Sequence, residues 1–134
     1  MPAGYSGTPL TKKLGLKEGH RAWLINEPDH YLNLFSDLPE IKILKSNPKK
    51  VNFVHLFCSM QKELIKDYPK AKSALLKDGM LWVSWPKKSA NIPSDLTRDW
   101  IRDYILERGL VDVKVCAVDE NWSGLKFVYR LQDR

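Results

Sequence analysis

Hydrophobic and polar residues follow two different periods along this chain. Three almost entirely apolar runs have the length of strands: Arg21–Asn26, Val51–Phe57 and Met80–Trp85. Apolar residues at helical spacing follow the second run from Ser59 and the third run from Ser94. The last two segments, Val111–Val118 and Gly124–Leu131, alternate apolar and polar residues, which is typical of a hairpin.

Shorter signals fill the intervals between these elements. Residues 1–10 contain two prolines and two glycines and are expected to form an extended arm. A helix from His30 to Leu38 and a short edge strand at Ile41–Leu44 are predicted between the first two long strands. A first short helix is predicted with Thr8 as its cap, Pro9 at its first position and Gly15 as its end. A second helix is predicted to start at the cap Ser59, break at Pro69 and continue in a further turn through Leu75 and Leu76. A third is predicted to start at Ser94 or Asp95 and to end at Gly109.

The order strand, helix, strand, helix, strand, helix predicts right-handed crossovers and therefore a parallel sheet. The final pair adds one antiparallel strand. This is the connectivity of class I methyltransferase-like Rossmann folds, whose last two strands form such a hairpin. The interval before Val51 has room for only one short strand. The predicted fold is therefore α/β, a shortened Rossmann-like, mostly parallel sheet with a C-terminal antiparallel hairpin.

Composition agrees with one folded domain over residues 1–134. The 134 residues are close to the commonest domain size, and a hydrophobic fraction of 43% excludes a mainly disordered chain. Apolar runs are too short to cross a bilayer, and no secretory signal opens the chain. The two cysteines, Cys58 and Cys116, form no CxxC pair. We therefore expect a cytoplasmic protein without a disulfide scaffold or a structural zinc site.

Positive charge is concentrated in one segment of the chain. The formal net charge is +6, and between Ile41 and Lys77 nine lysines face only Glu63 and Asp67, so this segment carries +7. Such a segment can be a solvated helix face and loop, or a weak patch for polyanions. Because neither exposed aromatic residues nor arginines are interleaved with these lysines, nucleic-acid binding is an alternative rather than the favoured function.

Three strings of residues resemble those of a small bacterial protein family of unknown function. They are YSGTPL at Tyr5–Leu10 with Lys12–Gly15, a string containing WPKKS at Trp82–Ser89, and VCAVDE at Val115–Glu120 followed by WSGLK at Trp122–Lys126. The strings occur in this order over nearly the whole chain. The resemblance implies a small cytoplasmic bacterial protein, and it implies neither a reaction nor a cofactor.

Polar residues follow each strand of the predicted parallel sheet. In such a sheet, ligands bind beyond the carboxyl ends of the strands, near the point where the strand order reverses. The hairpin turn should lie at the same edge, so the strings quoted above converge on one rim. The ligand-binding residues predicted for this rim are Asn26, Glu27, Ser59, Lys87, Lys88, Ser89, Asp119, Glu120 and Trp122.

The basic residues of this rim favour an anionic ligand. Lys87, Lys88 and Ser89 supply two ammonium groups and a hydroxyl directly after a buried strand, a combination that suits a phosphate or a carboxylate. The alternative is a solvated loop whose lysines lie over apolar surface. Acidic residues of the same rim could also pair with these lysines and leave no net attraction for an anion.

A methyltransferase of this fold binds S-adenosylmethionine (SAM) through a glycine-rich turn after its first strand and an acidic residue at the end of the next. This chain has Asn26-Glu27-Pro28-Asp29-His30 in place of the glycines, and Leu44-Lys45-Ser46-Asn47 at the end of the predicted edge strand. SAM binding is therefore not expected, and no other cofactor is predicted. The missing glycines also exclude a dinucleotide fingerprint and a P-loop.

Signals for catalysis and metal binding are weak. The three histidines have no ligand-like spacing, and His55, inside an apolar strand, is predicted to be a hydrogen-bonded core residue. Cys58 precedes a helix, a position that could favour a thiolate. A lone cysteine there is more often a small buried residue, and this role is predicted for Cys58. Cys116 lies within a strand and is predicted to be a core residue. No catalytic residue and no metal ligand is predicted.

The function hypothesis that follows is a binding domain for a small anionic ligand or a protein partner at the C-terminal rim of the sheet. One alternative is a divergent or degenerate SAM-dependent methyltransferase. Another is a weak nucleic-acid-associated protein that acts through the lysines of residues 41–77. The sequence leaves open whether the chain is an enzyme, and it does not identify the ligand.

Overall fold

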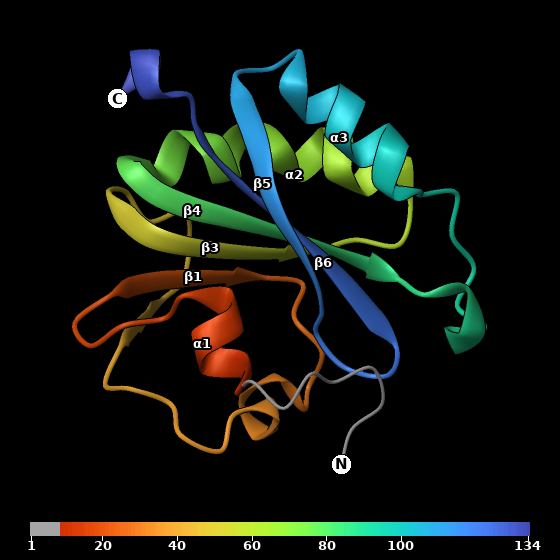
Figure 1. Ribbon diagram of the computed structural model, residues 1–134, viewed down its shortest axis with the longest axis horizontal. Helices are drawn as coiled ribbons and strands as arrows, with labels where there is room; N and C mark the ends of the chain where they lie inside the picture. Colours follow the sequence, from red (N-terminus) through yellow and green to blue (C-terminus); the bar gives the residue numbers. More distant parts are fainter. Residues whose placement is uncertain (1–8) are drawn as a thin grey trace.

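Six strands form one sheet in the computed structural model, which describes residues 9–134 (Figure 1). In chain order the strands are β1 (Arg21–Ile25), β2 (Lys42–Leu44), β3 (Val51–Phe57), β4 (Leu75–Pro86), β5 (Leu110–Ala117) and β6 (Trp122–Tyr129). The helices are α1 (Leu10–Leu14), α2 (Gln61–Ala74) and α3 (Arg98–Leu106), with short 3-10 helices η1 (Tyr31–Leu34), η2 (Lys88–Ala90) and η3 (Leu131–Asp133). The predicted N-terminal arm, apart from its last two residues, lies outside the described part of the chain, and so does the predicted cap Thr8.

The sheet has the order β2-β1-β3-β4-β6-β5. The first four of these strands are parallel to one another, and β6 runs antiparallel to both β4 and β5. This is the predicted mostly parallel α/β sheet with a C-terminal antiparallel hairpin. From β1 the chain moves outward to β2 and then returns to β3 on the other side of β1. The strand order therefore reverses between β1 and β3, which is where a sheet of this kind opens a crevice for ligands.

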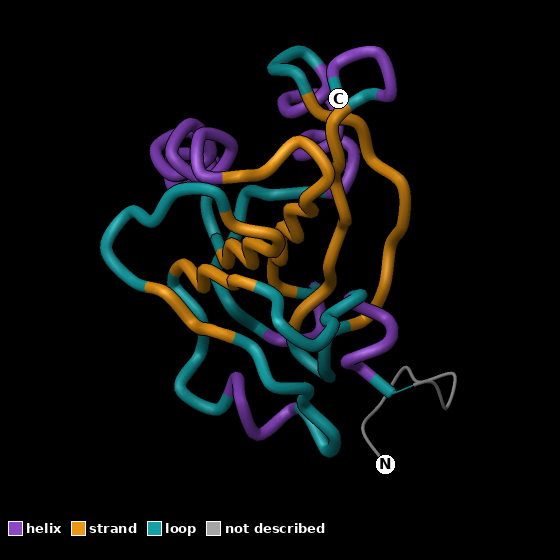
Figure 2. Tube along the Cα trace, turned by 90° about the vertical axis from the view of Figure 1, so that its left-hand side faces the viewer, coloured by secondary structure: helices purple, strands orange, loops and turns teal. Residues whose placement is uncertain are grey.

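The two faces of the sheet are covered by different elements. Helices α2 and α3 cover one face, and α1 with the loop around η1 covers the other (Figure 2). Strand β3 is buried on both sides, since Val54 and Leu56 belong to the core under α2 and α3 while Phe53 packs on the α1 side. Its near-continuous apolar sequence is explained by this double burial.

Trp82 and Trp85 point to opposite faces of β4, as their spacing predicts. Trp85 belongs to the core under α2 and α3, and Trp82 belongs to the smaller core under α1. The indole Nε1 of Trp82 donates to the carbonyl oxygen of Leu14 at 2.9 Å. That oxygen lies in the last turn of α1, where carbonyls lack partners within the helix. Trp82 therefore both packs under α1 and fixes its end.

The first helix is short and ends where the sequence predicts. Pro9 was expected in the first turn, but it precedes the helix, and its carbonyl oxygen accepts from Lys12 N and Lys13 N at 3.1 Å each. Gly15 follows the helix with φ +80°, and its N–H donates back to Thr11 O at 3.0 Å. A residue without Cβ adopts this left-handed conformation most readily, so the helix ends at glycine.

The predicted helix break at Pro69 does not occur. Helix α2 continues through Pro69 to Ala74. Proline lacks the N–H that would bond the carbonyl of Ile65, and both of these residues face solvent, where water can satisfy that carbonyl. On the opposite side, Leu64 and Tyr68 are buried against the sheet. Packing of this buried face stabilises the helix, and the hydrogen bond that the proline removes is on the solvent-exposed face.

The predicted second helical turn through Leu75 and Leu76 is also wrong, because both residues belong to β4. The pairing of β3 with β4 is irregular here, and the register shifts between Val51 and Phe53. Gly79 permits this close approach, since a Cβ at this position would lie 2.9 Å from the Leu75 side chain and 3.0 Å from Asn52 O. The apolar pair therefore continues the sheet instead of the helix.

Helix α2 starts one residue later than predicted. The residue before it is Met60, and the acceptor at this end is the side chain of Glu63 rather than that of Ser59. Glu63 Oε1 accepts from Ser59 N, Ser59 Oγ and Met60 N at 2.8–2.9 Å. Burial alone would raise the pKa of Glu63, but these hydrogen bonds outweigh it and lower the pKa.

Helix α3 begins after Thr97, and neither Ser94 nor Asp95 caps it. The Thr97 hydroxyl accepts from Trp100 N at 3.1 Å. Asp95 instead accepts from Gln61 N at 2.7 Å and so satisfies a free N–H at the start of α2. The sequence indicated Ser94 and Asp95 but not Thr97, and the role of Asp95 at the start of α2 depends on how the loop after β4 folds back. Gly109, with φ +106°, follows α3 as predicted.

The segment predicted as a helix from His30 to Leu38 forms only the short η1. Tyr31 turns inward and is 3% exposed, whereas Leu32 is half exposed. Phe35 and Leu38 leave the helix and pack on the α1 side of the sheet. The spacing of three that suggested one helical face therefore reflects separate contacts along an irregular loop. The predicted edge strand is present as β2.

Candidate functional site: the carboxyl-end rim

Asn26 occupies the point where the strand order reverses. It directly follows β1 and has φ +57°, a left-handed conformation that asparagine tolerates better than most residues. Its side-chain amide donates to Asp67 Oδ2 at 3.0 Å and to Phe57 O at 3.4 Å. Asp67 is almost fully buried in α2 and also pairs with Lys70 at 3.2 Å. Asn26 thus joins the ends of β1 and β3 to α2.

The loop after β1 is also tied to the hairpin turn between β5 and β6. His30 Nε2 lies 3.0 Å from Asp119 Oδ2. The other carboxylate oxygen, Oδ1, accepts from Asn121 N at 2.8 Å and from Trp122 N at 2.9 Å. Asp119 is 6% exposed, so it is a buried acceptor that shapes the turn. Glu120, which the sequence grouped with it, faces solvent.

The residues after β4 reach the same edge. Pro86 pairs with Trp122, and Lys87 N donates to Asn121 O at 2.9 Å. Lys88 and Ser89 form η2 and are exposed. The structure therefore brings the ends of β1, β3 and β4 and the hairpin turn to one rim. Whether a ligand binds across this rim stays a prediction.

A pocket of about 460 Å³ opens beside this rim at the carboxyl ends of the parallel strands β1 and β2. We call it the β1–β2 pocket, and it has the volume of a small-ligand site. Of the residues predicted for the rim, only Glu27 is among those that line it. The lining residues are Leu24, Glu27, Pro28, Asp29, Tyr31, Leu32, Ile43 and Lys45.

The chemistry of the β1–β2 pocket is mixed. Leu24 and Ile43 provide apolar surface from the two strands, while Glu27 and Asp29 provide carboxylates from the loop after β1. Lys45 adds an ammonium group after β2. The sequence identified Glu27 but missed the rest, because the short β2 strand carries little signal and its register against β1 is visible only in the fold. The acidic pair around Pro28 was the one available clue.

Beneath the rim lies a buried hydrogen-bonded row of side chains. Tyr31 Oη lies 2.9 Å from His55 Nδ1, and His55 Nε2 lies 2.7 Å from Ser84 Oγ. His55 is fully buried, and burial lowers its pKa to about 3. Burial also raises the pKa of Tyr31. The imidazole is therefore neutral, and the prediction of a hydrogen-bonded core histidine is confirmed. With His55 and Ser84 at 0% exposure, this row is structural.

The cysteines also have structural positions. Cys58 is 2% exposed, and burial raises the pKa of its thiol, with Glu63 and Asp67 adding to the effect. The prediction that Cys58 is a small buried residue is confirmed. Cys116 is only half-buried, so it is less of a core residue than predicted. Within residues 9–134, no group of three or more histidine, cysteine or acidic side chains could hold a metal ion. No helix in that range is long and apolar enough to span a membrane.

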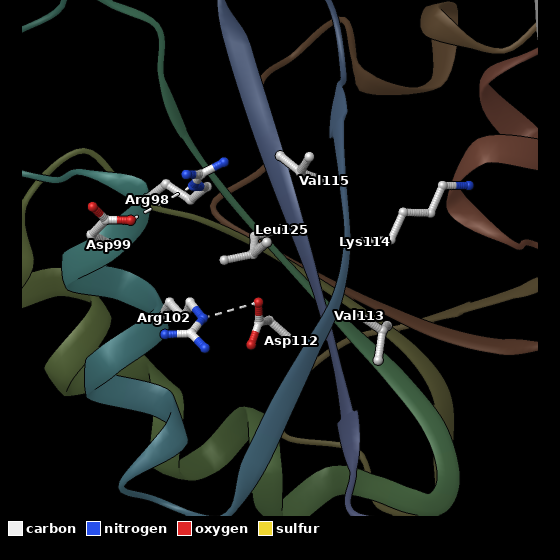
Figure 3. A pocket seen from close by; sticks show the side chains of 8 residues that line it. All are labelled: Arg98, Asp99, Arg102, Asp112, Val113, Lys114, Val115 and Leu125. Atoms are coloured by element: carbon white, nitrogen blue, oxygen red, sulfur yellow. Dashed lines mark hydrogen bonds and ion pairs between the residues drawn. The ribbon is translucent and has the colours of Figure 1, made fainter.

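A second hollow, of about 450 Å³, lies between α3 and the edge strand β5 (Figure 3). Leu125 and Val115 are among the residues that line it, and Arg102, also in the lining, pairs with Asp112 at 3.2 Å. Both partners of this ion pair are partly exposed, so it adds little to stability. This groove is remote in the sheet order from the point where the strands reverse, because β5 is the opposite edge from β2.

Comparison with known proteins identifies the fold. A protein from Sulfolobus solfataricus described as a putative type 11 methyltransferase superposes with a TM-score of 0.62 at 13% identity, covering 90% of this chain and 89% of that one. Aeropyrum pernix fibrillarin with bound SAM also gives 0.62, at 14% identity over 93% and 70% of the two chains. A SAM-dependent methyltransferase from Aquifex aeolicus gives 0.57, at 17% identity over 88% and 86%. At these identities the likeness shows a shared Rossmann-like methyltransferase fold.

Sequence comparison gives no relative. No family profile matches the chain, and no curated protein matches it. The resemblance to a bacterial family of unknown function therefore stays a prediction, and function has to be argued from the site itself.

Proposed function

We propose that this chain binds a nucleoside-containing ligand of the SAM class in the β1–β2 pocket. The observation that carries the proposal is the place of Glu27 and Asp29, whose carboxylates line a ligand-sized pocket at the ends of two parallel strands. In sheets of this kind the carboxylate that accepts hydrogen bonds from the ribose hydroxyls follows the second strand. Here Glu27 and Asp29 offer equivalent acceptors from the loop after β1. Some proteins that share the fold bind SAM or S-adenosylhomocysteine, which supports the same ligand class here.

The two sequence features that argued against SAM have structural substitutes. Glycine is absent from the loop after β1, and Asn26 supplies the left-handed backbone of such a turn but not its lack of a side chain. An acidic residue is absent after β2, yet the loop after β1 supplies two carboxylates to the same pocket. These substitutes support a divergent form of the methyltransferase fold. They favour binding, and we assign no side chain of the pocket to methyl transfer.

The charge of the pocket favours a neutral or cationic ligand. Glu27 and Asp29 outnumber Lys45, so a polyphosphate would meet net repulsion, whereas the cationic sulfonium and ammonium groups of SAM would be attracted. Leu24 and Ile43 offer apolar surface for a base. Lys45 is suited to the carboxylate of the ligand.

Thermal unfolding with a panel of compounds tests the proposal. SAM, S-adenosylhomocysteine and adenosine should raise the melting temperature with increasing concentration, since a ligand of the folded state stabilises by mass action. ATP should raise it less. Replacing both carboxylates, Glu27→Gln with Asp29→Asn, should reduce the ligand-induced rise in melting temperature at least fivefold. The matched control is Asp99→Asn with Glu107→Gln, which removes two exposed carboxylates, one in α3 and one directly after it.

Two results would overturn this function. The first is the absence of stabilisation by any of these compounds at millimolar concentration. The second is stabilisation by ATP or pyrophosphate alone, abolished by Lys87→Ala with Lys88→Ala. That second result would instead support the anionic ligand predicted from the sequence for the rim.

A further inference from the structure

Two lysines face each other across the antiparallel pair formed by β5 and β6. Lys114 is the register partner of Lys126, so two positive charges are directly opposite on neighbouring strands. Such a pair destabilises a sheet. Burial lowers the pKa of Lys126, and the charges of Lys114 and Lys17 lower it further. Like charges in this arrangement are expected to cost stability in the free protein, and a bound anion would neutralise them.

Other lysines extend this positive surface on the α1 side of the sheet. Lys126 Nζ lies beside Gly15 at the end of α1, and Lys114 Nζ donates to Lys13 O at 3.1 Å. Figure 3 shows Lys114 pointing away from α3 and toward α1. Around the half-buried Cys116, burial raises the thiol pKa, and the charges of Lys13, Lys114 and Lys87 oppose that shift. We call these residues the lysine cluster: Lys13, Lys17, Lys87, Lys114 and Lys126.

Four lysines of the cluster have no acidic partner among the described residues. Within the part of the chain that the structure describes, Lys17, Lys87, Lys114 and Lys126 form no ion pair with an acidic side chain. The sequence had instead singled out residues 41–77, where several lysines are already engaged. Lys70 pairs with Asp67, and Lys72 and Lys77 lie over the ring of Tyr129.

The extent of the cluster indicates what kind of anion fits it. Lys87 follows Pro86, which pairs with Trp122, and Lys126 lies four residues further along β6. At about 3.3 Å per residue this separation is roughly 13 Å along the strand. One small anion cannot reach both ends, whereas successive phosphates of a polymer can.

We propose that the lysine cluster binds the phosphodiester backbone of a nucleic acid strand, independently of base sequence. Lysine acts here as a point charge for phosphate. The affinity comes from release of counterions from the strand, so it falls steeply with salt. The strand runs along the α1 side of β5 and β6, from the rim at Lys87 toward the end of α1. This site is separate from the β1–β2 pocket and does not depend on it.

Fluorescence anisotropy with a labelled oligouridylate tests the proposal. The wild-type protein should bind at low salt, and Lys114→Gln with Lys126→Gln should weaken binding at least tenfold. The slope of log K against log salt should become shallower by about 1.4, because each lost phosphate contact on a single strand contributes about 0.7. The control, Lys62→Gln with Lys66→Gln on the exposed side of α2, leaves the same net charge of +4 and should change affinity less than twofold.

Three results would overturn the proposal. If the wild-type protein does not bind the oligouridylate at low salt, the cluster is not a nucleic-acid site. If both double variants weaken binding equally, overall charge rather than the cluster is responsible. If polyglutamate or pyrophosphate competes as well as unlabelled oligouridylate, the site takes an acidic protein segment or a small phosphate instead. Melting temperatures of both variants close to that of the wild type show that the comparison is between folded proteins.

Discussion

Asn26 donates its side-chain amide to Asp67 and so fastens the loop after β1 to α2, at the place where the strand order reverses. Two properties of asparagine are used together here, its tolerance of a left-handed backbone and its amide donor. The same loop then carries Glu27 and Asp29 into the β1–β2 pocket. The conformation of Asn26 is therefore a condition for the proposed site.

Substitution of Asn26 separates these two properties. Asn26→Gly keeps the left-handed backbone and loses the hydrogen bond, whereas Asn26→Ala loses both. We expect the alanine variant to be less stable than the glycine variant by about 1 kcal/mol, even though glycine has the more flexible unfolded chain. Urea unfolding measures the difference. An alanine variant more stable than the glycine variant would show that the backbone conformation at Asn26 carries no strain for alanine.

Acid should destabilise the protein through His55. Burial holds the pKa of His55 at about 3, below its ordinary value of 6.5, so the unfolded chain binds the proton first as pH falls. The contribution of neutral His55 to the free energy of unfolding is fully present above pH 6.5. It decreases by about 1.4 kcal/mol per pH unit as the pH falls toward 3. Unfolding curves of the wild type and His55→Gln, compared at several pH values, isolate this contribution. Parallel pH profiles would mean that His55 titrates normally in the folded protein.

Trp82 should control the docking of α1. Trp82→Phe keeps much of the packing and removes the hydrogen bond to Leu14 O, at a cost of about 1 kcal/mol. Trp82→Ala should cost about 3–5 kcal/mol. In the phenylalanine variant, trypsin should cleave faster after Lys12 or Lys13 than in the wild type, because the end of α1 is loosened. An unchanged cleavage rate there would show that the indole does not hold the helix.

Lys126→Gln should stabilise the protein in the absence of any ligand. The substitution removes one of two like charges that face each other across β5 and β6. The expected gain is a few tenths of a kcal/mol at low salt. It should shrink at high salt, because Lys114 is exposed and Lys126 is only partly buried, so salt screens their repulsion. Denaturant unfolding at two ionic strengths measures it. A loss of stability at low salt would mean that Lys126 has a favourable partner and that its charge is not in excess.

The long apolar runs were sufficient to predict the sheet, because strands buried on both faces leave a continuous signal such as Val51–Phe57. Predictions were weaker where tertiary contacts override local preference. Pro69 stays within α2 because the backbone hydrogen bond that it removes is on the solvent-exposed face. Asp95 accepts a hydrogen bond at the start of α2 and does not cap α3, the helix that follows it. Tyr31 is taken into the core by His55, which shortens the predicted helix to η1.

Of the candidate site, the sequence predicted the residues of the rim, but of the pocket only Glu27 and of the lysine cluster only Lys87. Glu27 was identified because it follows a strand directly. Lys45 and Asp29 were not, because their approach depends on the register of the three-residue strand β2 against β1. The pairing of Lys114 with Lys126 depends on a bulge in β5 that shifts the register between Asp112 and Lys114. Alternation along the strand alone does not reveal such a shift.

Nuclear magnetic resonance titration of the labelled protein with S-adenosylhomocysteine tests the central proposal most directly. Saturable shifts of backbone amides are expected within residues 24–32 and 43–45, which include all the residues that line the β1–β2 pocket. The variant Glu27→Gln with Asp29→Asn should show smaller shifts at the same ligand concentrations. Absence of saturable shifts, or shifts confined to Lys87–Ser89 and the hairpin turn, would contradict a nucleoside site in this pocket.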